Sequence, residues 1–218
     1  MRRKLHSLQE AGYAWFDAQR VGRRGGRKLF IDAGANLGQG FSWFSRRFKD
    51  ADIDFELLEP NPHCQAALTD LTAGFDRQAT VLPVALGTAV GKLKFYGLSD
   101  DQGGATSQGG SIVKAHNSAL YQADDASAIE VDVIDACAYV KARARIYDVM
   151  LMKMDIEGAE LDVLDAMVDD GCIDLIDTLF VEFHSQYRDG QARHLAEEQE
   201  RNLIGRLRRR GVRFRIWH

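Results

Sequence analysis

Residues 29–40, LFIDAGANLGQG, carry an apolar strand pattern that ends at an acid and runs directly into a glycine-rich turn. Gly34, Gly38 and Gly40 follow Asp32 in this turn, and glycine adopts backbone angles that other residues avoid, so the main chain can approach a ligand closely. The run after the turn has the pattern of a helix. A strand, a glycine turn and a helix in this order predict a loop that binds a nucleoside cofactor.

The acid at the end of this strand indicates which cofactor to expect. In a dinucleotide site the helix N-terminus receives a pyrophosphate, which a carboxylate at Asp32 would repel. S-adenosylmethionine instead carries a positive amine and a sulfonium, which a carboxylate attracts. The glycine spacing also departs from the dinucleotide fingerprint. We therefore expect S-adenosylmethionine, and the alternative is a turn that needs glycine only for tight packing.

The chain has the length and composition of one globular domain, with 218 residues, 45% hydrophobic and 28% charged. Its three cysteines are widely spaced and form no CxxC pair, so we expect free thiols rather than a zinc site. No apolar run has the length of a signal peptide core or a membrane span. We expect a cytoplasmic protein.

Charge is distributed unevenly, although the net charge is only -4. Residues 1–28 hold eight Lys or Arg against two acids, and residues 193–218 hold eight against three. These basic ends could contact nucleic acid, an anionic glycan or a membrane surface. The alternative, which we favour for the C-terminal end, is a solvated helix whose arginines pair with the preceding glutamates. Those glutamates are Glu197, Glu198 and Glu200.

Strand patterns alternate with helix patterns along most of the chain. The expected strands cover residues 28–34, 54–60, 80–87, 146–156 and 177–184. The expected helices cover residues 41–50, 62–71 and 160–171, with Asn61 capping the second and Gly171 ending the third. Because the strands are almost continuously apolar, they predict a doubly wound, mostly parallel α/β sheet with helices on both faces.

Residues 87–135 interrupt this alternation. They contain a strand pattern at 91–98, a loop insertion around 99–128 that is rich in Gly, Ser and Asp, and a second strand pattern at 128–135. The strands suggest an antiparallel extension. A loop that leaves the third strand could close over a substrate, and an ordinary surface loop is the alternative.

Glu59 ends the second expected strand, where a carboxylate can accept hydrogen bonds from both ribose hydroxyls. Pro60 follows it and belongs to the same predicted site. The alternative for Glu59 is a pair with a surface arginine. The backbone around Ala85 and Leu86, after the third strand, is then placed to contact the adenine.

The densest polar cluster lies at the end of the fourth expected strand, in LMKMDIEGAE. Lys153, Asp155 and Glu157 alternate with apolar residues, so they would share one face of the strand. Charges in so apolar a strand need partners or a ligand, and we favour a functional role for Asp155. We interpret Glu160 as a helix N-terminal residue that the helix dipole favours.

Taken together, DAGANLG, LLEPNP, VLPVALG with GKLKFY, and LMKMDIEGAELDVL resemble the FkbM family of S-adenosylmethionine-dependent methyltransferases across residues 29–184. The family's typical fourth-strand motif is K-x-D-x-E-G-x-E. The resemblance implies a class I, Rossmann-like methyltransferase fold and transfer of a methyl group to a hydroxyl of a sugar, glycan or natural product. It places Glu59 at the ribose and Asp155 near the methyl group. It places four residues around the methionine part: Asp32, Gly34, Asn36 and Gly38.

The family fold also has a seven-stranded sheet whose last strand is antiparallel, but this chain has room for only one helix and one strand after residue 184. The seventh strand could be missing, supplied by a partner chain, or replaced by the N-terminal segment, in which residues 5–16 predict an amphipathic helix. We divide the chain into a basic N-terminal helical segment, residues 1–28, and a methyltransferase domain, residues 29–218.

Transfer to a hydroxyl needs a group that removes its proton, and the candidates are Asp155, Glu157 and His184. Asp155, Glu157 and Glu182 could hold a divalent metal, but the set is not diagnostic and we predict no metal site.

A dinucleotide oxidoreductase is disfavoured by Asp32 and the glycine spacing. A noncatalytic or polyanion-binding protein on the same fold stays as the alternative, with nucleic acid as a less expected partner.

Overall fold

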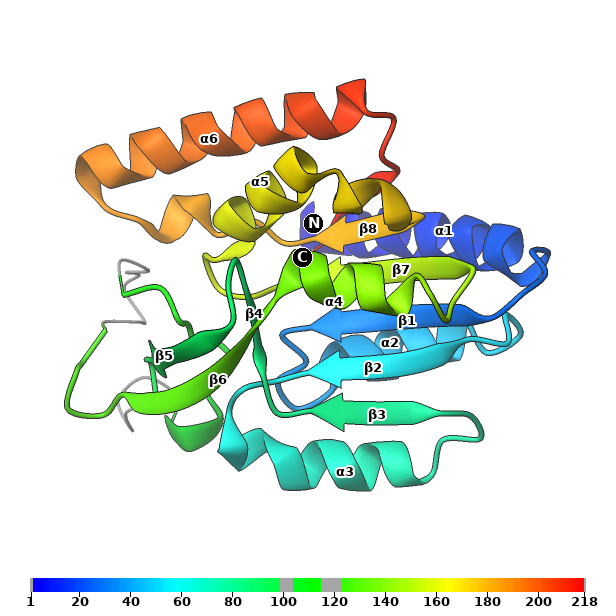
Figure 1. Ribbon diagram of the computed structural model, residues 1–218, viewed down its shortest axis with the longest axis horizontal. Coiled ribbons are helices and arrows are strands. Elements are labelled where there is room, and N and C mark those ends of the chain that lie inside the picture. Colours follow the sequence, from blue (N-terminus) through cyan, green and yellow to red (C-terminus); the bar gives the residue numbers. More distant parts are fainter. Residues whose placement is uncertain (1, 99–103, 115–122, 218) are drawn as a thin grey trace.

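A computed structural model describes residues 2–98, 104–114 and 123–217. Its centre is a sheet of six parallel strands in the order β3-β2-β1-β7-β8-β9 (Figure 1). These strands are β1 (Lys28–Ala33), β2 (Asp54–Leu58), β3 (Ala79–Leu82), β7 (Val149–Met154), β8 (Thr178–Val181) and β9 (Phe214–Ile216). The predicted doubly wound α/β class is confirmed.

The helices are α1 (Arg2–Gly22), α2 (Gln39–Arg47), α3 (Gln65–Ala73), α4 (Ala136–Arg143), α5 (Glu160–Asp170) and α6 (Gly190–Arg209). Short 3-10 turns lie at η1 (Pro62–Cys64), η3 (Gly104–Thr106), η4 (Cys172–Leu175) and η5 (Ser185–Tyr187). The sequence prediction missed α4, although its capping signal is present: Asp135 accepts a hydrogen bond from the backbone N–H of Ala138 at 2.6 Å. In the described part of the chain, no helix is long and apolar enough to cross a membrane.

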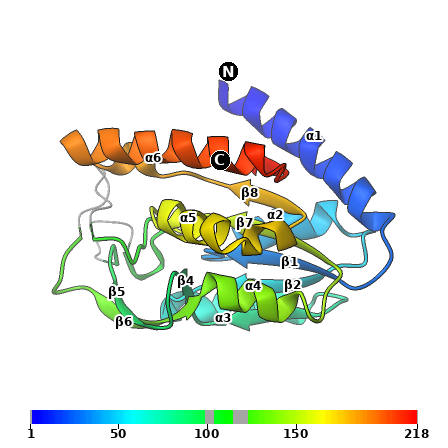
Figure 2. The same cartoon turned by 45° about the horizontal axis from the view of Figure 1, so that its top comes forward.

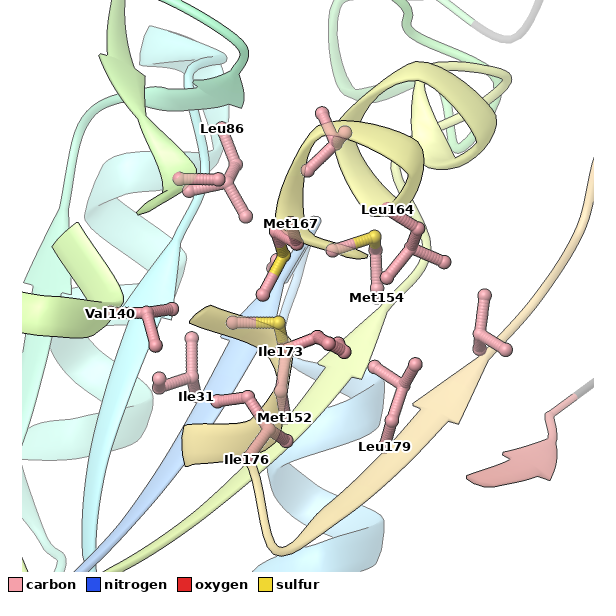
Figure 3. Close-up of a cluster of buried hydrophobic side chains, with 14 of the residues drawn as sticks. Ile31, Leu86, Val140, Met152, Met154, Leu164, Met167, Ile173, Ile176 and Leu179 are labelled. Atoms are coloured by element: carbon pink, nitrogen blue, oxygen red, sulfur yellow. The ribbon is translucent and has the colours of Figure 1, made fainter. Parts of the chain in front are cut away.

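Helices cover both faces of the sheet. In Figure 1, α4 and α5 lie in front of it and α2 behind. On the front face, Met152 and Met154 of β7 pack with Leu164 and Met167 of α5 (Figure 3). On the back face, the ring of Phe30 in β1 lies among aromatic rings of α2 and β2, at centroid distances of 4.5 to 5.7 Å. Burial on both faces explains why the strands read as continuous apolar runs.

The third expected strand, residues 80–87, is in fact two strands, so that prediction was wrong. Pro83 has no N–H to give to a sheet, and the chain turns there, with the N–H of Val84 donating to the carbonyl of Leu82 at 2.9 Å. β3 ends before the turn and stays in the main sheet. After the turn, β4 (Ala85–Gly87) enters a second sheet.

This second sheet has the order β4-β6-β5 and also contains β5 (Gly91–Phe95) and β6 (Ile129–Asp135). β5 pairs antiparallel with β6, which confirms the predicted antiparallel extension. Both views place the small sheet beyond the carboxyl ends of β1, β2 and β3 (Figures 1 and 2). It therefore extends the edge at which parallel sheets bind ligands.

The seven-stranded sheet with an antiparallel last strand is not observed. α6 is the long connection between β8 and β9, and a single crossover helix returns the chain in the parallel direction. In the described residues the main sheet has no seventh strand. The N-terminal segment is the expected helix, α1, whose Ala14, Ala18 and Val21 are buried in the core behind the sheet.

The basic ends of the chain fold back onto acids of its middle. Arg20 and Arg24 both pair with Asp177. In α6, Arg206 pairs with Asp165 at 2.7 Å and Arg210 with Asp174 at 2.6 Å, so their partners lie in and after α5 rather than among the predicted glutamates. Glu197 instead pairs with Arg193, one turn before it in α6, at 2.7 Å. Cys64, Cys137 and Cys172 are free thiols, as predicted.

Candidate active site

A cavity of about 420 Å³ lies at the carboxyl ends of the main-sheet strands. This is the place where open α/β sheets bind ligands, and the volume is within the range of small-molecule sites. Eight of the predicted site residues line it: Gly34, Asn36, Glu59, Pro60, Ala85, Leu86, Asp155 and Glu157. Asp32, Gly38 and His184 are absent from its lining.

The glycine turn runs between the ends of β2 and β7, which leaves no room for side chains. Gly34 has φ 81°, and a Cβ built on it would lie 1.8 Å from the carbonyl oxygen of Asp155. A Cβ on Gly40 would lie 2.6 Å from Oδ2 of Asp32. The first contact is with backbone, which cannot rotate away, so glycine is required at position 34.

Glu59 is held with its carboxylate at the cavity wall. Its Oε2 accepts the backbone N–H of Asn36 at 2.7 Å and its Oε1 accepts that of Asn61 at 2.9 Å. Burial raises the pKa of Glu59, and these two hydrogen bonds oppose that effect. Each oxygen retains capacity to accept a further hydrogen bond from a ligand hydroxyl.

One described part of the predicted loop insertion, residues 104–114, lies on the cavity. Asn61 Nδ2 donates to the carbonyl of Ala105 at 2.8 Å, and Asn36 Nδ2 donates to that of Ser107 at 3.2 Å. Farther along, Ser111 Oγ donates to the carbonyl of Glu157 at 2.6 Å. The loops after β1, β2 and β7 therefore all hold this segment.

Asp32, Lys153 and Asp155 form a charged row under the glycine turn. The Nζ of Lys153 lies 3.1 Å from Oδ1 of Asp32 and 3.2 Å from Oδ2 of Asp155, and it donates to the carbonyl of Gly34 at 3.0 Å. Burial alone would lower the pKa of Lys153, but the two carboxylates outweigh it and raise the pKa, so the amine is charged. Asp32 thus affects the cavity indirectly: it holds Lys153, whose ammonium donates to the glycine turn.

His184 lies behind Asp155 and Glu157 and is 3% exposed. Its Nδ1 is 2.9 Å from Oε1 of Glu160, a fully buried carboxylate that also accepts the N–H groups of Ile156 and Gly158. Its Nε2 lies 3.4 Å from Glu157 and 3.7 Å from Asp155. Burial alone would lower the pKa of His184, but these three carboxylates raise it to about 10. The ring is therefore an imidazolium at neutral pH.

This charge state bears on metal binding. Asp155, Glu157 and His184 place ligand atoms within 4.8 Å of one another, a spacing that could hold a metal ion. These carboxylates also favour the protonated imidazole, so a metal ion would have to displace that proton before His184 could bind it. We therefore do not assign these three residues as metal ligands.

Glu182 follows β8 directly and lines the cavity beside Asp155. Its backbone N–H donates to the carbonyl of Met154 at 3.0 Å, which continues the β7–β8 pairing by one residue. Burial and the charge of Asp155 raise the pKa of Glu182 to about 7. From the sequence, Glu182 is a candidate only for a metal ligand.

Aromatic side chains of the cavity were not predicted. Phe95 from β5, Trp43 from α2 and Trp217 after β9 all line it, and the two indoles meet edge to face with centroids 4.7 Å apart. Phe95 lies inside the strand pattern predicted at residues 91–98, in the segment that interrupts the α/β alternation, and this pattern is a usable signal. Trp217 is far away in sequence, and only the return of the chain along β8 brings it here.

A parallel sheet with a glycine turn after its first strand, and with acids after β2, β7 and β8 around one cavity, defines a Rossmann-like α/β protein with its cavity at the carboxyl ends of the strands. A family model described as the methyltransferase FkbM domain matches residues 32–214. The chain therefore belongs to the FkbM methyltransferase family.

One solved structure, a methyltransferase FkbM from Methylobacillus flagellatus KT, is similar with 16% sequence identity and a TM-score of 0.39. The similarity covers 66% of this chain and 29% of that one. This chain thus spans less than a third of that protein's length. A search of curated proteins found no match.

Proposed function

We propose that the protein is an S-adenosylmethionine-dependent O-methyltransferase whose acceptor is a hydroxyl of a sugar, glycan or natural product. Membership of the FkbM family supports methyl transfer. The observation that carries the choice of cofactor is the cavity that joins the turn at Gly34, the carboxylate of Glu59 and the acid Asp155.

The charges around the cavity suit this cofactor. Four of the described residues that line it are acids: Glu59, Asp155, Glu157 and Glu182. Lys153 is the one basic residue among them, and Asp32 and Asp155 already neutralise it. Such a wall attracts an amine and a sulfonium, whereas it repels the pyrophosphate of a dinucleotide.

In this proposal Glu59 binds the ribose hydroxyls, and the backbone around Ala85 and Leu86 contacts the adenine. The glycine turn surrounds the methionine part, and Asp155 lies near the methyl group. When bound, S-adenosylmethionine supplies an activated methyl on sulfur, so the protein's main task is to hold an acceptor oxygen in line with it. The acidic wall disfavours carboxylate or phosphate acceptors, which supports a neutral hydroxyl.

The polyanion-binding alternative depends on free positive charge at the two ends of the chain. Arg20, Arg24, Arg206 and Arg210 are each paired with an acid of the same chain. Pairing of this kind lowers the field available to a polyanion. We therefore rank this alternative below methyl transfer.

The proposal is tested by incubating the protein with S-adenosylmethionine that carries an isotope-labelled methyl group and a panel of monosaccharides, oligosaccharides and polyols. We expect labelled methyl ethers and a matching yield of S-adenosylhomocysteine. Label that appears only on amino or carboxylate compounds in a parallel panel would contradict the hydroxyl acceptor. No transfer together with no binding of the donor would contradict the cofactor.

A further inference from the structure

The four acids of the cavity wall differ in the hydrogen-bond and ion-pair partners of their carboxylates. Glu59 accepts two backbone N–H groups, Asp155 pairs with Lys153, and Glu157 faces the imidazolium of His184. Glu182 also lines the cavity, and among the described residues no side chain forms a hydrogen bond or ion pair with its carboxylate. Within the described parts of the chain, Glu182 is thus the acid of this wall whose carboxylate is available to a ligand.

The charged groups that shift the pKa of Glu182 lie at the carboxyl ends of β7 and β8. Asp155 and Glu157, after β7, repel its negative charge, whereas Lys153 and His184 attract it. Burial and repulsion outweigh this attraction, so the pKa of Glu182 rises to about 7. A carboxylate with a pKa near the working pH is a far stronger base than an ordinary glutamate and is still deprotonated in a large fraction of molecules.

We propose that Glu182 is the general base that accepts the proton of the acceptor hydroxyl, an inference that rests on the proposed methyl transfer. As the acceptor oxygen forms its bond to the methyl carbon, the carbon–sulfur bond breaks and its electron pair stays on sulfur. The hydroxyl proton moves to the Glu182 carboxylate, which becomes a neutral carboxylic acid and later releases the proton to water.

This assignment separates Glu182 from the three bases that the sequence suggested. His184 is protonated and lies behind the wall, so it has no lone pair for the acceptor proton. Asp155 lies 3.2 Å from the ammonium of Lys153 and Glu157 lies 3.4 Å from the ring of His184, so both carboxylates already contact a basic side chain. In this arrangement His184 and Lys153 are positioning residues that hold the two acids in place beside Glu182.

The test compares wild type with Glu182→Gln and with the control Glu130→Gln, an exposed glutamate of β6 that pairs with Lys92. Protein labelled with ¹³C at the glutamate carboxyl carbons is titrated by NMR without an acceptor. We expect one carboxyl resonance that titrates near pH 7 in wild type and control and is missing in Glu182→Gln. Thermal unfolding checks that all three proteins fold.

In the transfer assay with the monosaccharide panel, Glu182→Gln should lower kcat by about 100-fold to 10,000-fold, the usual contribution of a general base, with unchanged binding of S-adenosylmethionine. The loss of activity of wild type below pH 7 should also disappear. Retention of wild-type kcat by Glu182→Gln, or no glutamate that titrates near pH 7, would overturn the assignment of Glu182 alone. Failure of folded wild type to bind S-adenosylmethionine would overturn the proposed function.

Discussion

The ammonium of Lys153 lies 3.1 Å from Oδ1 of Asp32, and the two side chains are 4% and 0% exposed. The residues face each other across the β1–β7 pairing, in the middle of the sheet. The same ammonium donates to the carbonyl of Gly34. The pair therefore links the central strands to the glycine turn and fixes the position of the turn relative to the sheet.

Replacing Lys153 by Met would leave the carboxylate of Asp32 buried without its cation. Removing one partner of a buried ion pair costs about 3–5 kcal/mol, and we expect a loss of that order in the free energy of unfolding. Urea unfolding measures it. The exposed Lys92→Met is the control and should leave the unfolding midpoint unchanged.

The double variant Asp32→Asn, Lys153→Met distinguishes a charge effect from a packing effect. Because it buries no lone charge, we expect it to be more stable than Lys153→Met by at least about 1 kcal/mol. Equal stability of the single and double variants would contradict the ion-pair account.

The imidazolium of His184 should be visible by NMR. We expect its ring carbons to titrate near pH 10 in wild type. In Glu160→Gln the hydrogen-bonded negative charge is gone, so the pKa should fall by at least about 1 unit, a change of about 1.4 kcal/mol in the balance between the two protonation states. Glu197→Gln in α6 is the control. A wild-type pKa near the ordinary value of 6.5 would contradict the buried cation.

The same pair sets a pH dependence of stability. The folded pKa of His184 lies above its unfolded value, so its contribution is complete below about pH 6.5 and is lost as the pH rises to about 10. Wild type should lose more stability over this window than Glu160→Gln. Unfolding by urea at several pH values measures the difference, and parallel profiles would contradict it.

Gly34→Ala tests the geometry of the turn. The new Cβ would meet the carbonyl of Asp155 at a position with positive φ, so we expect a loss of more than about 2 kcal/mol from strain and displacement of the turn. Binding of S-adenosylmethionine should be lost with it. In the control Gly91→Ala, the Cβ meets nothing within 4 Å, and stability should change by less than about 0.5 kcal/mol.

Asn61→Ala tests how the segment at residues 104–114 is held. Asn61 accepts the N–H of His63 and donates to the carbonyl of Ala105, so the variant loses a helix cap and an anchor. We expect a destabilisation of about 1 kcal/mol and faster hydrogen exchange at Gly104–Thr106. Exchange at Gly104–Thr106 equal to that of the exposed control Asn202→Ala would contradict the anchoring role.

Much of the fold could be predicted because its signals are local. β1, β2, β7 and β8 are buried on both faces, so each reads as an apolar run, and the acids at their ends stand out against it. The glycine turn is visible for the same reason. The split at Pro83 was missed because both halves are apolar, and only the proline marks the turn between different sheets.

Site residues could be predicted where they directly follow a predicted strand. They could not be predicted where their role depends on contacts between segments far apart in the sequence. Glu59 and Asp155 could be placed from strand ends alone. The charge on His184 could not be predicted, because it depends on Glu160 in α5 and on the loop after β7. Glu182 could be seen as an acid, but that no described side chain pairs with it is a property of the folded wall. Trp217 reaches the cavity only through the crossover of α6.

The central claim is that the cavity binds S-adenosylmethionine through the carboxylate of Glu59. Isothermal titration calorimetry of S-adenosylmethionine and of NAD into wild type, Glu59→Gln and the control Glu130→Gln tests it most directly. We expect saturable binding of S-adenosylmethionine to wild type and control, and a Kd raised about 10-fold to 100-fold in Glu59→Gln, because hydrogen bonds to a charged acceptor contribute about 1.5–3 kcal/mol. Binding of NAD in preference to S-adenosylmethionine, or equal affinity in folded Glu59→Gln, would contradict the account.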